Sequence, residues 1–233
     1  MAVDYSFFCE NCRKAETIWK FSKKILNDCI RRKKIQEAEY QTRVMALLYC
    51  TVAEAYFLKI VHTPGKLIDT EVDEILQTAK DYGIGNAWKK CLEIGLARCE
   101  AQNSAHIPNV KRKVEKLIDH FIFDPAEVRN KIAHGQWETA FNRDSTAVNL
   151  KITKKIETLD ISTIEKNKYV LKELAQIMND ILVSPNKAHM RDYWGYVCGL
   201  EEELKRRSRW NIETKQTKLK AQPPKMYHVH DED

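Results

Sequence analysis

Residues 44–58 of the chain, Val-Met-Ala-Leu-Leu-Tyr-Cys-Thr-Val-Ala-Glu-Ala-Tyr-Phe-Leu, form its most apolar stretch. Apolar residues fall on every side of a helix drawn through it, which predicts that other elements cover this helix on several sides. The stretch carries Thr51 and Glu54 and is only 15 residues long, shorter than the roughly 20 residues that a bilayer span needs. We therefore expect a buried core helix over about residues 36–62, and no membrane anchor.

The composition of the whole chain favours helices. The 233 residues include only 7 Gly and 6 Pro, where average usage gives roughly 16 Gly and 12 Pro. In the long segments between them, apolar residues recur at three- and four-residue steps, which is typical of amphipathic helices. These segments cover about residues 12–34, 36–62, 69–82, 86–100, 109–121, 124–134, 162–183 and 187–207. The sequence thus predicts an all-α fold with a single domain over residues 1–210.

Two of these helices have strong start signals. Asp124 can cap exposed amides, Pro125 suits the first helical position, and Glu127 can reach back as in a capping box. Ser162 and Glu165 have the spacing of a second capping box.

The segment between these two helices differs from the rest. Gly135 can take the left-handed backbone that ends many helices. Residues 136–141 and 147–159 then alternate in polarity around the turn-forming residues 142–145, a pattern typical of a β-hairpin. We predict a small hairpin insertion at about residues 136–160. At the other end of the chain, residues 211–233 are polar and are expected to form a disordered tail.

Charge and cysteine content limit the class of protein. The balance of 39 basic and 33 acidic residues gives a net charge of +6, which permits nucleic acid as a partner without implying it. The chain has an odd number of cysteines, 7, and its first residues lack the basic and apolar regions of a secretory signal. We expect a cytoplasmic protein with free thiols.

The segment Arg129-Asn130-Lys131-Ile132-Ala133-His134-Gly135 resembles the signature of the HEPN family, which is an Arg, four to six residues and a His. A polar residue often follows the Arg, as Asn130 does here. The resemblance implies a HEPN-like helical bundle, with the helix at 187–207 as an addition. It also implies metal-independent cleavage of RNA without a cofactor, by a homodimer, since the family includes toxins, antiphage effectors and CRISPR-associated nucleases.

The residue types suit that chemistry. Attack of a ribose 2′-OH on its own phosphate needs a proton acceptor, a proton donor and a cation for the charge that develops at phosphorus. An imidazole titrates near neutrality, so His134 is a candidate for proton transfer. Arg129 keeps its charge, and its planar fork can grip two phosphate oxygens. Asn130 is a candidate for orienting Arg129 or the substrate.

The spacing of the pair adds a constraint. Five steps along an α-helix rotate a side chain by roughly 140° and advance it by about 7.5 Å, so one helix does not easily aim Arg129 and His134 at the same phosphate. Either the helix ends at Gly135 and His134 turns back, or two copies of the chain combine their residues. We favour a homodimer with a cleft lined by Asn130 and Lys131 of both copies.

Other interpretations of these residues stay open. An Arg and a His at this spacing are often solvated surface groups, and a HEPN-like module can bind RNA, a nucleotide or a partner protein without cleavage. Glu54 can orient Arg129 or form a purely structural ion pair. HEPN toxins neutralised by nucleotidylation have Tyr two residues after the His, where this chain has Gln136. We do not expect that control, although an antitoxin or regulatory protein remains a candidate partner.

Three basic runs are candidates for contact with an RNA backbone, at residues 31–34, 111–113 and 205–209. Such runs are also common on solvated helix faces. Lys111, Arg112 and Lys113 are the best candidates because they precede the helix that carries the motif.

Cys9 and Cys12 have the spacing of a zinc knuckle or a redox pair. A structural zinc needs four ligands, and the chain has no second pair of this kind. His228 and His230 can complete a set only by a long return of the chain, so we expect no metal. A zinc-stabilised nucleic-acid-binding protein is the third interpretation.

Overall fold

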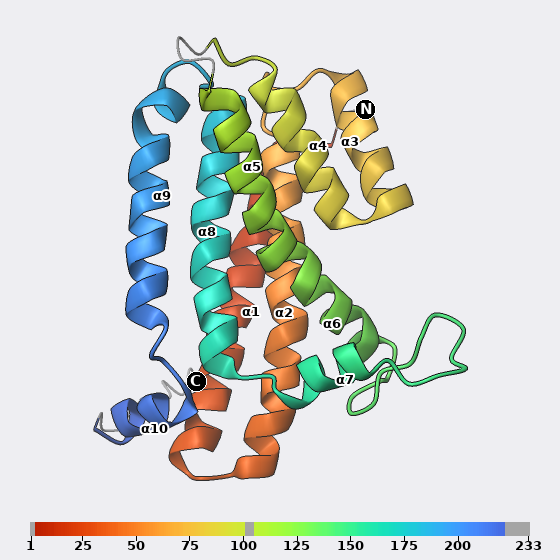
Figure 1. Cartoon of the computed structure of the whole chain (residues 1–233), viewed down its shortest axis with the longest axis vertical. Coiled ribbons are helices and arrows are strands. Elements are labelled where there is room, and N and C mark those ends of the chain that lie inside the picture. Colours follow the sequence, from red (N-terminus) through yellow and green to blue (C-terminus); the bar gives the residue numbers. More distant parts are fainter. Residues whose placement is uncertain (1–2, 101–104, 222–233) are drawn as a thin grey trace, which may run out of the picture.

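The computed structural model describes residues 3–100 and 105–221. Within these ranges the regular elements are all helices, which confirms the predicted all-α class (Figure 1). The elements are α1 (Tyr5–Arg31), α2 (Ile35–Val61), α3 (Asp69–Tyr82), α4 (Ile84–Leu96), α5 (His106–Ile118), the π-helical segment η1 (Asp119–Phe123), α6 (Asp124–Ala133), α7 (Leu150–Glu157), α8 (Ile161–Val183), α9 (Ala188–Arg207) and α10 (Ile212–Ala221).

The apolar helix α2 lies at the centre of the bundle. It packs against α1, α4, α6 and α8, and residues such as Met45, Val52 and Phe57 are almost completely buried there. By length and hydropathy alone, α2 would also qualify as a membrane span, with a mean hydropathy of 1.7 over its most apolar window. Buried core helices pass the same test, and half of this window is buried inside the bundle, where four helices pack against α2.

The remaining helices surround this centre. Figure 1 shows α8 beside α2, with α9 outside α8, and the α3–α4 hairpin on the opposite flank of the molecule. A single residue, Gly83, joins α3 to α4. The loop at residues 134–149 and the short helix α7 then connect α6 to α8.

α6 begins at Asp124 as predicted, but the predicted cap at Asp124 is wrong, because α5, η1 and α6 follow one another without a break from His106 to Ala133. Asp124 is itself helical, and its backbone N–H donates to the Asp119 carbonyl. Pro125 has no N–H for the carbonyl four residues earlier, that of Phe121. The buried hydroxyl of Tyr49 donates to this carbonyl instead, at 2.5 Å. A contact from α2 therefore replaces the backbone bond that Pro125 removes.

The π-helical segment determines which face of α6 meets the core. A π turn accommodates one extra residue, and one residue corresponds to roughly 100° around a helix. With this rotation Val128 and Ile132 of α6 are buried, while Arg129 faces Glu54 of α2. A change in the register of η1 would move Arg129 away from this position.

The predicted β-hairpin is wrong in its second half. An isolated antiparallel bridge joins Phe141 to Val148, but residues 150–157 form α7. The side chain of Asn149 caps this helix by accepting from the N–H of Ile152. Ile152 and Ile156 are buried, and their four-residue spacing places both on one helical face.

Two other boundary predictions are corrected. The cap of α8 is Asp160, whose side chain accepts from the N–H of Thr163, so Ser162 and Glu165 do not form a capping box. The expected tail at 211–233 is wrong for residues 212–221, which form α10 against α1 and α8. The buried Lys215 anchors α10 through an ion pair with Glu165 of α8. Residues 222–233 lie outside the described part of the chain.

A pair of buried histidines joins the first turns of α5 and α9. Nε2 of His106 lies 3.2 Å from Nε2 of His189, and His189 is only 1% exposed. The rings of Tyr193 and Trp194 pack around the pair. Because the two nitrogens face each other, one must donate and the other accept, which requires a neutral acceptor ring.

This pair predicts a loss of stability in acid. Burial, reinforced by the neighbouring His106, lowers the pKa of His189 to about 4, whereas an unfolded histidine has a pKa near 6.5. Between these values the unfolded chain binds a proton that the folded chain does not. The contribution of His189 to the free energy of unfolding should thus be fully present above about pH 6.5. It should fall by about 2–3 kcal/mol from about pH 7.5 to about pH 4.5. Urea titrations at both pH values should show a smaller decline in His189→Gln, and equal declines would contradict the prediction.

Candidate functional site

Arg129 lies in α6 and faces α2, where its guanidinium Nη2 forms an ion pair with Oε1 of Glu54. Its Nη1 donates to Oδ1 of Asn130 at 3.1 Å. The side chains of Arg129 and Glu54 remain 32% and 42% exposed. The contact that the sequence suggested between Glu54 and Arg129 is therefore present, and it orients the guanidinium without shielding it from solvent.

A cleft opens beside this ion pair. It has a volume of about 570 Å³ and lies between α2, the α3–α4 hairpin and the η1–α6 segment, with Arg129, Asn130 and Glu54 in its wall. Neither Lys131 nor His134 is among the described residues that line this cleft. The structure thus brings three of the predicted residues to one cleft and places the other two elsewhere.

Close packing at the start of α4 shapes one end of the cleft. A Cβ atom on Gly85 would lie 2.5 Å from the ring of Phe123, which belongs to η1. Only glycine therefore allows α4 to approach the π-helical segment this closely. This approach fixes the α3–α4 hairpin relative to Arg129.

An unreactive thiol lies behind the arginine. Cys50 is one helical turn before Glu54 on α2 and is 5% exposed. Burial raises its pKa to about 12, although the nearby Arg129 opposes this. A thiol in this state is neutral at physiological pH and poorly nucleophilic, so Cys50 serves as apolar packing under Arg129.

His134 ends the motif helix as its C-cap. Gly135 has a φ of +80°, which confirms the predicted left-handed residue at this helix end. The N–H of Gln136 donates to the Lys131 carbonyl at 2.9 Å, and that of Gly135 to the Ile132 carbonyl at 3.1 Å. These two bonds form a Schellman motif. The helix therefore stops at a fixed place, one residue after Ala133.

The His134 imidazole is exposed and, within the described part of the chain, makes no side-chain hydrogen bond or ion pair. It does not turn back into the cleft of Arg129. Both ring nitrogens are available to an external group. Of the two arrangements considered from the sequence, the one in which a single chain brings Arg129 and His134 together is not the one observed.

Lys131 holds a loop next to α6. Its Nζ donates to the Phe141 carbonyl at 2.5 Å and so holds the loop at residues 134–149 against α6. Arg43 of α2 holds the same loop by donating from Nε to the Trp137 carbonyl at 2.8 Å. The segment around His134 is thereby tied to the bundle at two points.

The predicted RNA-binding residues lie on α5, outside the cleft. Lys113 is engaged in an ion pair with Glu201 of α9, and Arg112 donates to Asn109 at 3.1 Å. Lys111 is exposed. Of these three side chains, Lys111 is therefore the one whose charge is not already directed to a neighbouring side chain.

The structure offers no support for a metal at the cysteine pair. Cys12 is buried and its thiol donates to the Ala55 carbonyl at 3.0 Å. Within residues 3–100 and 105–221, no three His, Cys, Asp or Glu side chains form a group able to hold a metal ion. His228 and His230 lie outside the described residues.

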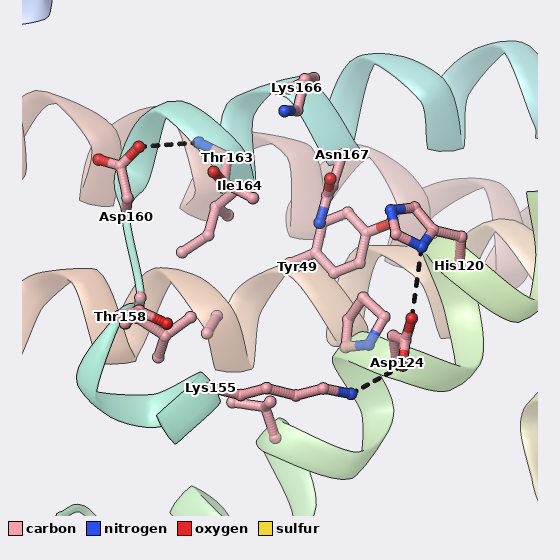
Figure 2. A pocket seen from close by; sticks show the side chains of 14 residues that line it. Tyr49, His120, Asp124, Lys155, Thr158, Asp160, Thr163, Ile164, Lys166 and Asn167 are labelled. Carbon is pink, nitrogen blue, oxygen red and sulfur yellow. Dashed lines mark hydrogen bonds and ion pairs between the residues drawn. The ribbon is translucent and has the colours of Figure 1, made fainter. Parts of the chain in front are cut away.

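A second, smaller cavity contains a titratable cluster that sequence reasoning missed. It has a volume of about 280 Å³ and lies between α2, α6, α7 and α8. Figure 2 shows Lys155 of α7 reaching Asp124, with His120 on the other side of the same carboxylate. The Lys155 Nζ is 2.7 Å from Asp124 and 3.2 Å from Glu127.

This cluster fastens α7 to α6. Two carboxylates hold one ammonium, whereas His120 lies 3.4 Å from Asp124 and is 70% exposed, which makes it a weak partner. The acidic residues in the first turn of α6 were visible in the sequence, but their cation comes from about 30 residues further along. The only local hint was Pro125, which marks the irregular turn on which the cluster is built.

Comparisons of this chain with protein-family models, with curated proteins and with solved structures found no match.

Proposed function

We propose that the chain is a metal-independent endoribonuclease of a prokaryotic toxin or antiphage type, which acts as a HEPN-like homodimer. The observation that supports this best is the arrangement of the two motif residues, Arg129 and His134. Arg129 is oriented by Glu54 and Asn130 in the wall of an open cleft, and His134 ends the same helix with an exposed imidazole.

The guanidinium keeps enough donors to hold a phosphate. It has five N–H groups, of which Glu54 and Asn130 take one each and the Cys50 thiol takes a third. The remaining two can donate to phosphate oxygens. As charge develops at phosphorus in the transition state, these bonds strengthen, which is the kind of stabilisation that accelerates a reaction.

In the proposed reaction, the 2′-oxygen bonds to phosphorus and the bond from phosphorus to the 5′-oxygen breaks. A base removes the 2′-OH proton and an acid protonates the leaving 5′-oxygen, which gives a 2′,3′-cyclic phosphate and a 5′-hydroxyl end. Two imidazoles, one from each chain, would serve as base and acid. No oxidant, reductant or metal enters this balance.

The surface around His134 favours pairing of two copies. Trp137, Phe141, Val148 and Leu150 expose 36%, 37%, 48% and 77% of their surface on the loop and helix that follow the motif. Exposed apolar side chains gathered in one segment are typical of an interaction surface. A second copy that covers them would bring a second His134 close to the first, which the reaction requires.

Leu150 offers a clean test of this surface. It is the first residue of α7, where an aspartate is favourable for the helix, so Leu150→Asp should fold normally. We expect the variant to be monomeric by sedimentation at micromolar concentration and to lose at least about tenfold of the cleavage rate. Ile68→Asp is the matched control, since Ile68 is 63% exposed and precedes α3. An active monomer would contradict the dimer.

The experiment that tests the function is incubation of labelled RNA with the full chain in excess chelator. We expect cleavage that yields cyclic phosphate ends and that Arg129→Ala and His134→Ala abolish. Cleavage that survives both substitutions would remove the assignment. RNA binding without cleavage would instead favour the alternative, a non-catalytic module that binds RNA, a nucleotide or a partner protein through the same cleft.

The proposal also includes a cellular location and a regulatory partner. We infer a cytoplasmic location, which the free state of the cysteines supports, and a regulatory protein or antitoxin that restrains the nuclease. Copurification of a partner that suppresses cleavage would test the second point.

A further inference from the structure

We propose that the small cavity between α2, α6, α7 and α8 binds one free amino acid with an apolar side chain. The cavity shares none of its lining residues with the Arg129 cleft. The site therefore goes beyond the proposed nuclease function and does not depend on it.

The size of the cavity suits a single small molecule. Its volume is about 280 Å³, near the lower end of the range for ligand pockets, which leaves room for one amino acid but not for a peptide. The side of the cavity at His120 and Asp124 is open to solvent, since these side chains are 70% and 46% exposed. A ligand can enter from this side while the helices stay in place.

Spare hydrogen-bonding capacity gathers at one end of the cavity. Figure 2 shows Asn167, His120, Asp124 and Lys155 together there. The Asp124 carboxylate can accept further bonds besides its contacts with Lys155 and His120. The Lys155 ammonium has three N–H groups, of which Asp124 and Glu127 take one each. Because the Asn167 amide has no side-chain partner within the described part of the chain, both an acceptor and several donors are left for a ligand.

The rest of the wall offers mainly packing. At the other end, the Asp160 carboxylate already accepts from the N–H of Thr163, and the Thr158 hydroxyl donates to the Lys154 carbonyl. The apolar side chains of the lining are those of Ala46, Pro125, Val128, Leu159 and Ile164. A ligand that matches this division has a polar head at the open end and an apolar tail inside.

The charges of the lining select the head group. Asp124 and Asp160 balance Lys155 and Lys166, so the cavity does not favour an anion or a cation. A lone carboxylate on the ligand would lie against Asp124 and a lone amine against Lys155, and an unbalanced charge in a partly buried place costs free energy.

A zwitterion meets both requirements. Its ammonium can donate to Asp124, while its carboxylate accepts from Asn167 and Lys155. The two protein charges lie close together, with Nζ of Lys155 only 2.7 Å from Oδ1 of Asp124, so the two ligand charges must also be adjacent. A free amino acid carries both on one carbon atom, whereas the end of a peptide carries only one of them.

An NMR titration of the ¹⁵N-labelled full chain with L-leucine tests the site. We expect saturable shifts of amides in α7 and in the first turns of α8, with a Kd of about 1 mM or lower, as a ligand of this size allows. N-acetyl-L-leucine lacks the ammonium, L-leucinamide lacks the carboxylate, and glycine lacks the apolar side chain. Each of the three should bind at least about tenfold more weakly, because each leaves part of the site unmatched.

Variants assign the binding to named side chains. Asp124→Asn and Asn167→Ala should each raise the Kd for L-leucine at least about fivefold. The matched control is Glu127→Gln, because Glu127 contacts the same Lys155 ammonium and is similarly exposed, at 52% against 46% for Asp124, but does not line the cavity. This control should change the Kd less than about twofold. If Asp124→Asn fails to fold, Asn167→Ala and the three analogues still decide.

Several results would overturn the site. They are the absence of saturable shifts at about 20 mM L-leucine, shifts confined to other helices, and equal binding of N-acetyl-L-leucine or L-leucinamide. A Glu127→Gln variant that binds as weakly as Asp124→Asn would do the same, because the loss would then come from the ion pairs of Lys155 and not from the cavity. RNA cleavage is not a readout here, so the amino-acid site and the nuclease can fail independently.

Discussion

Replacing His134 with alanine is expected to slow RNA cleavage by about 10²–10⁴-fold, the usual contribution of a positioned acid or base. The imidazole is exposed and has no side-chain partner in the described structure, so its removal should leave the fold intact. RNA binding should change little, because His134 lies outside the cleft that holds the phosphate. The loss should therefore appear in kcat rather than in KM.

The pH dependence gives a second readout. If two imidazoles act as base and acid, the wild-type rate should show a bell-shaped pH profile, and the residual rate of His134→Ala should not. The matched control is His120→Ala, since His120 is an exposed histidine that follows α5 and lines the other cavity. Equal losses in the two variants, or an unchanged profile in His134→Ala, would show that His134 does not transfer protons.

The helices were largely predictable because burial leaves a periodic trace in the sequence. The exception at Asp124 is caused by a partner that lies far away in the chain. Asp124 and Pro125 have the local pattern of a helix start, yet the helix continues because Tyr49, 76 residues before Pro125, satisfies the freed carbonyl of Phe121. No local pattern carries that information, and the capping preferences assume that the helix begins there.

The misread hairpin has a different origin. Residues 150–157 contain isoleucine and threonine, which favour strands as well as a buried helical face. The alternation was too short to separate a period of two from one of 3.6. The deciding features were the cap at Asn149 and the four-residue spacing of Ile152 and Ile156.

The candidate site was predicted in part. The contact of Glu54 with Arg129 follows from a carboxylate on an otherwise apolar helix, because such a group needs a partner. The separation of His134 from the cleft could be expected from helix geometry alone. The cleft itself could not, since it depends on how the α3–α4 hairpin packs against η1, where Gly85 meets the ring of Phe123.

A buried ion pair holds the short helix α10 against the bundle. Glu165 of α8 lies 2.7 Å from Lys215 of α10 and 2.8 Å from Lys23 of α1. The side chains of Glu165 and Lys215 are only 9% and 8% exposed. Burial opposes the charged form of Glu165, but Lys215 and Lys23 outweigh it and lower its pKa. Burial also lowers the pKa of Lys215.

Replacing Glu165 with glutamine should release α10 from the bundle. The substitution keeps the shape but removes the ion-pair partner of the buried Lys215 ammonium, and breaking a buried pair in this way typically costs about 3–5 kcal/mol. Because α10 has few contacts beyond α1 and α8, its detachment exposes Lys215 to water at a lower cost than global unfolding. The chain should therefore take this route, and the remaining helices should stay folded.

Hydrogen exchange distinguishes local detachment of α10 from unfolding of the whole bundle. Amides of residues 212–221 should exchange about 100-fold faster in Glu165→Gln, with α2 and α8 unchanged, because local opening has its own free energy. The control is Glu74→Gln, which breaks the exposed pair with Lys90 and should cost less than about 1 kcal/mol. If α10 kept its protection in Glu165→Gln, its apolar contacts alone would suffice to dock it. A uniform loss of protection would instead mean that α10 unfolds together with the bundle and is a full part of the core.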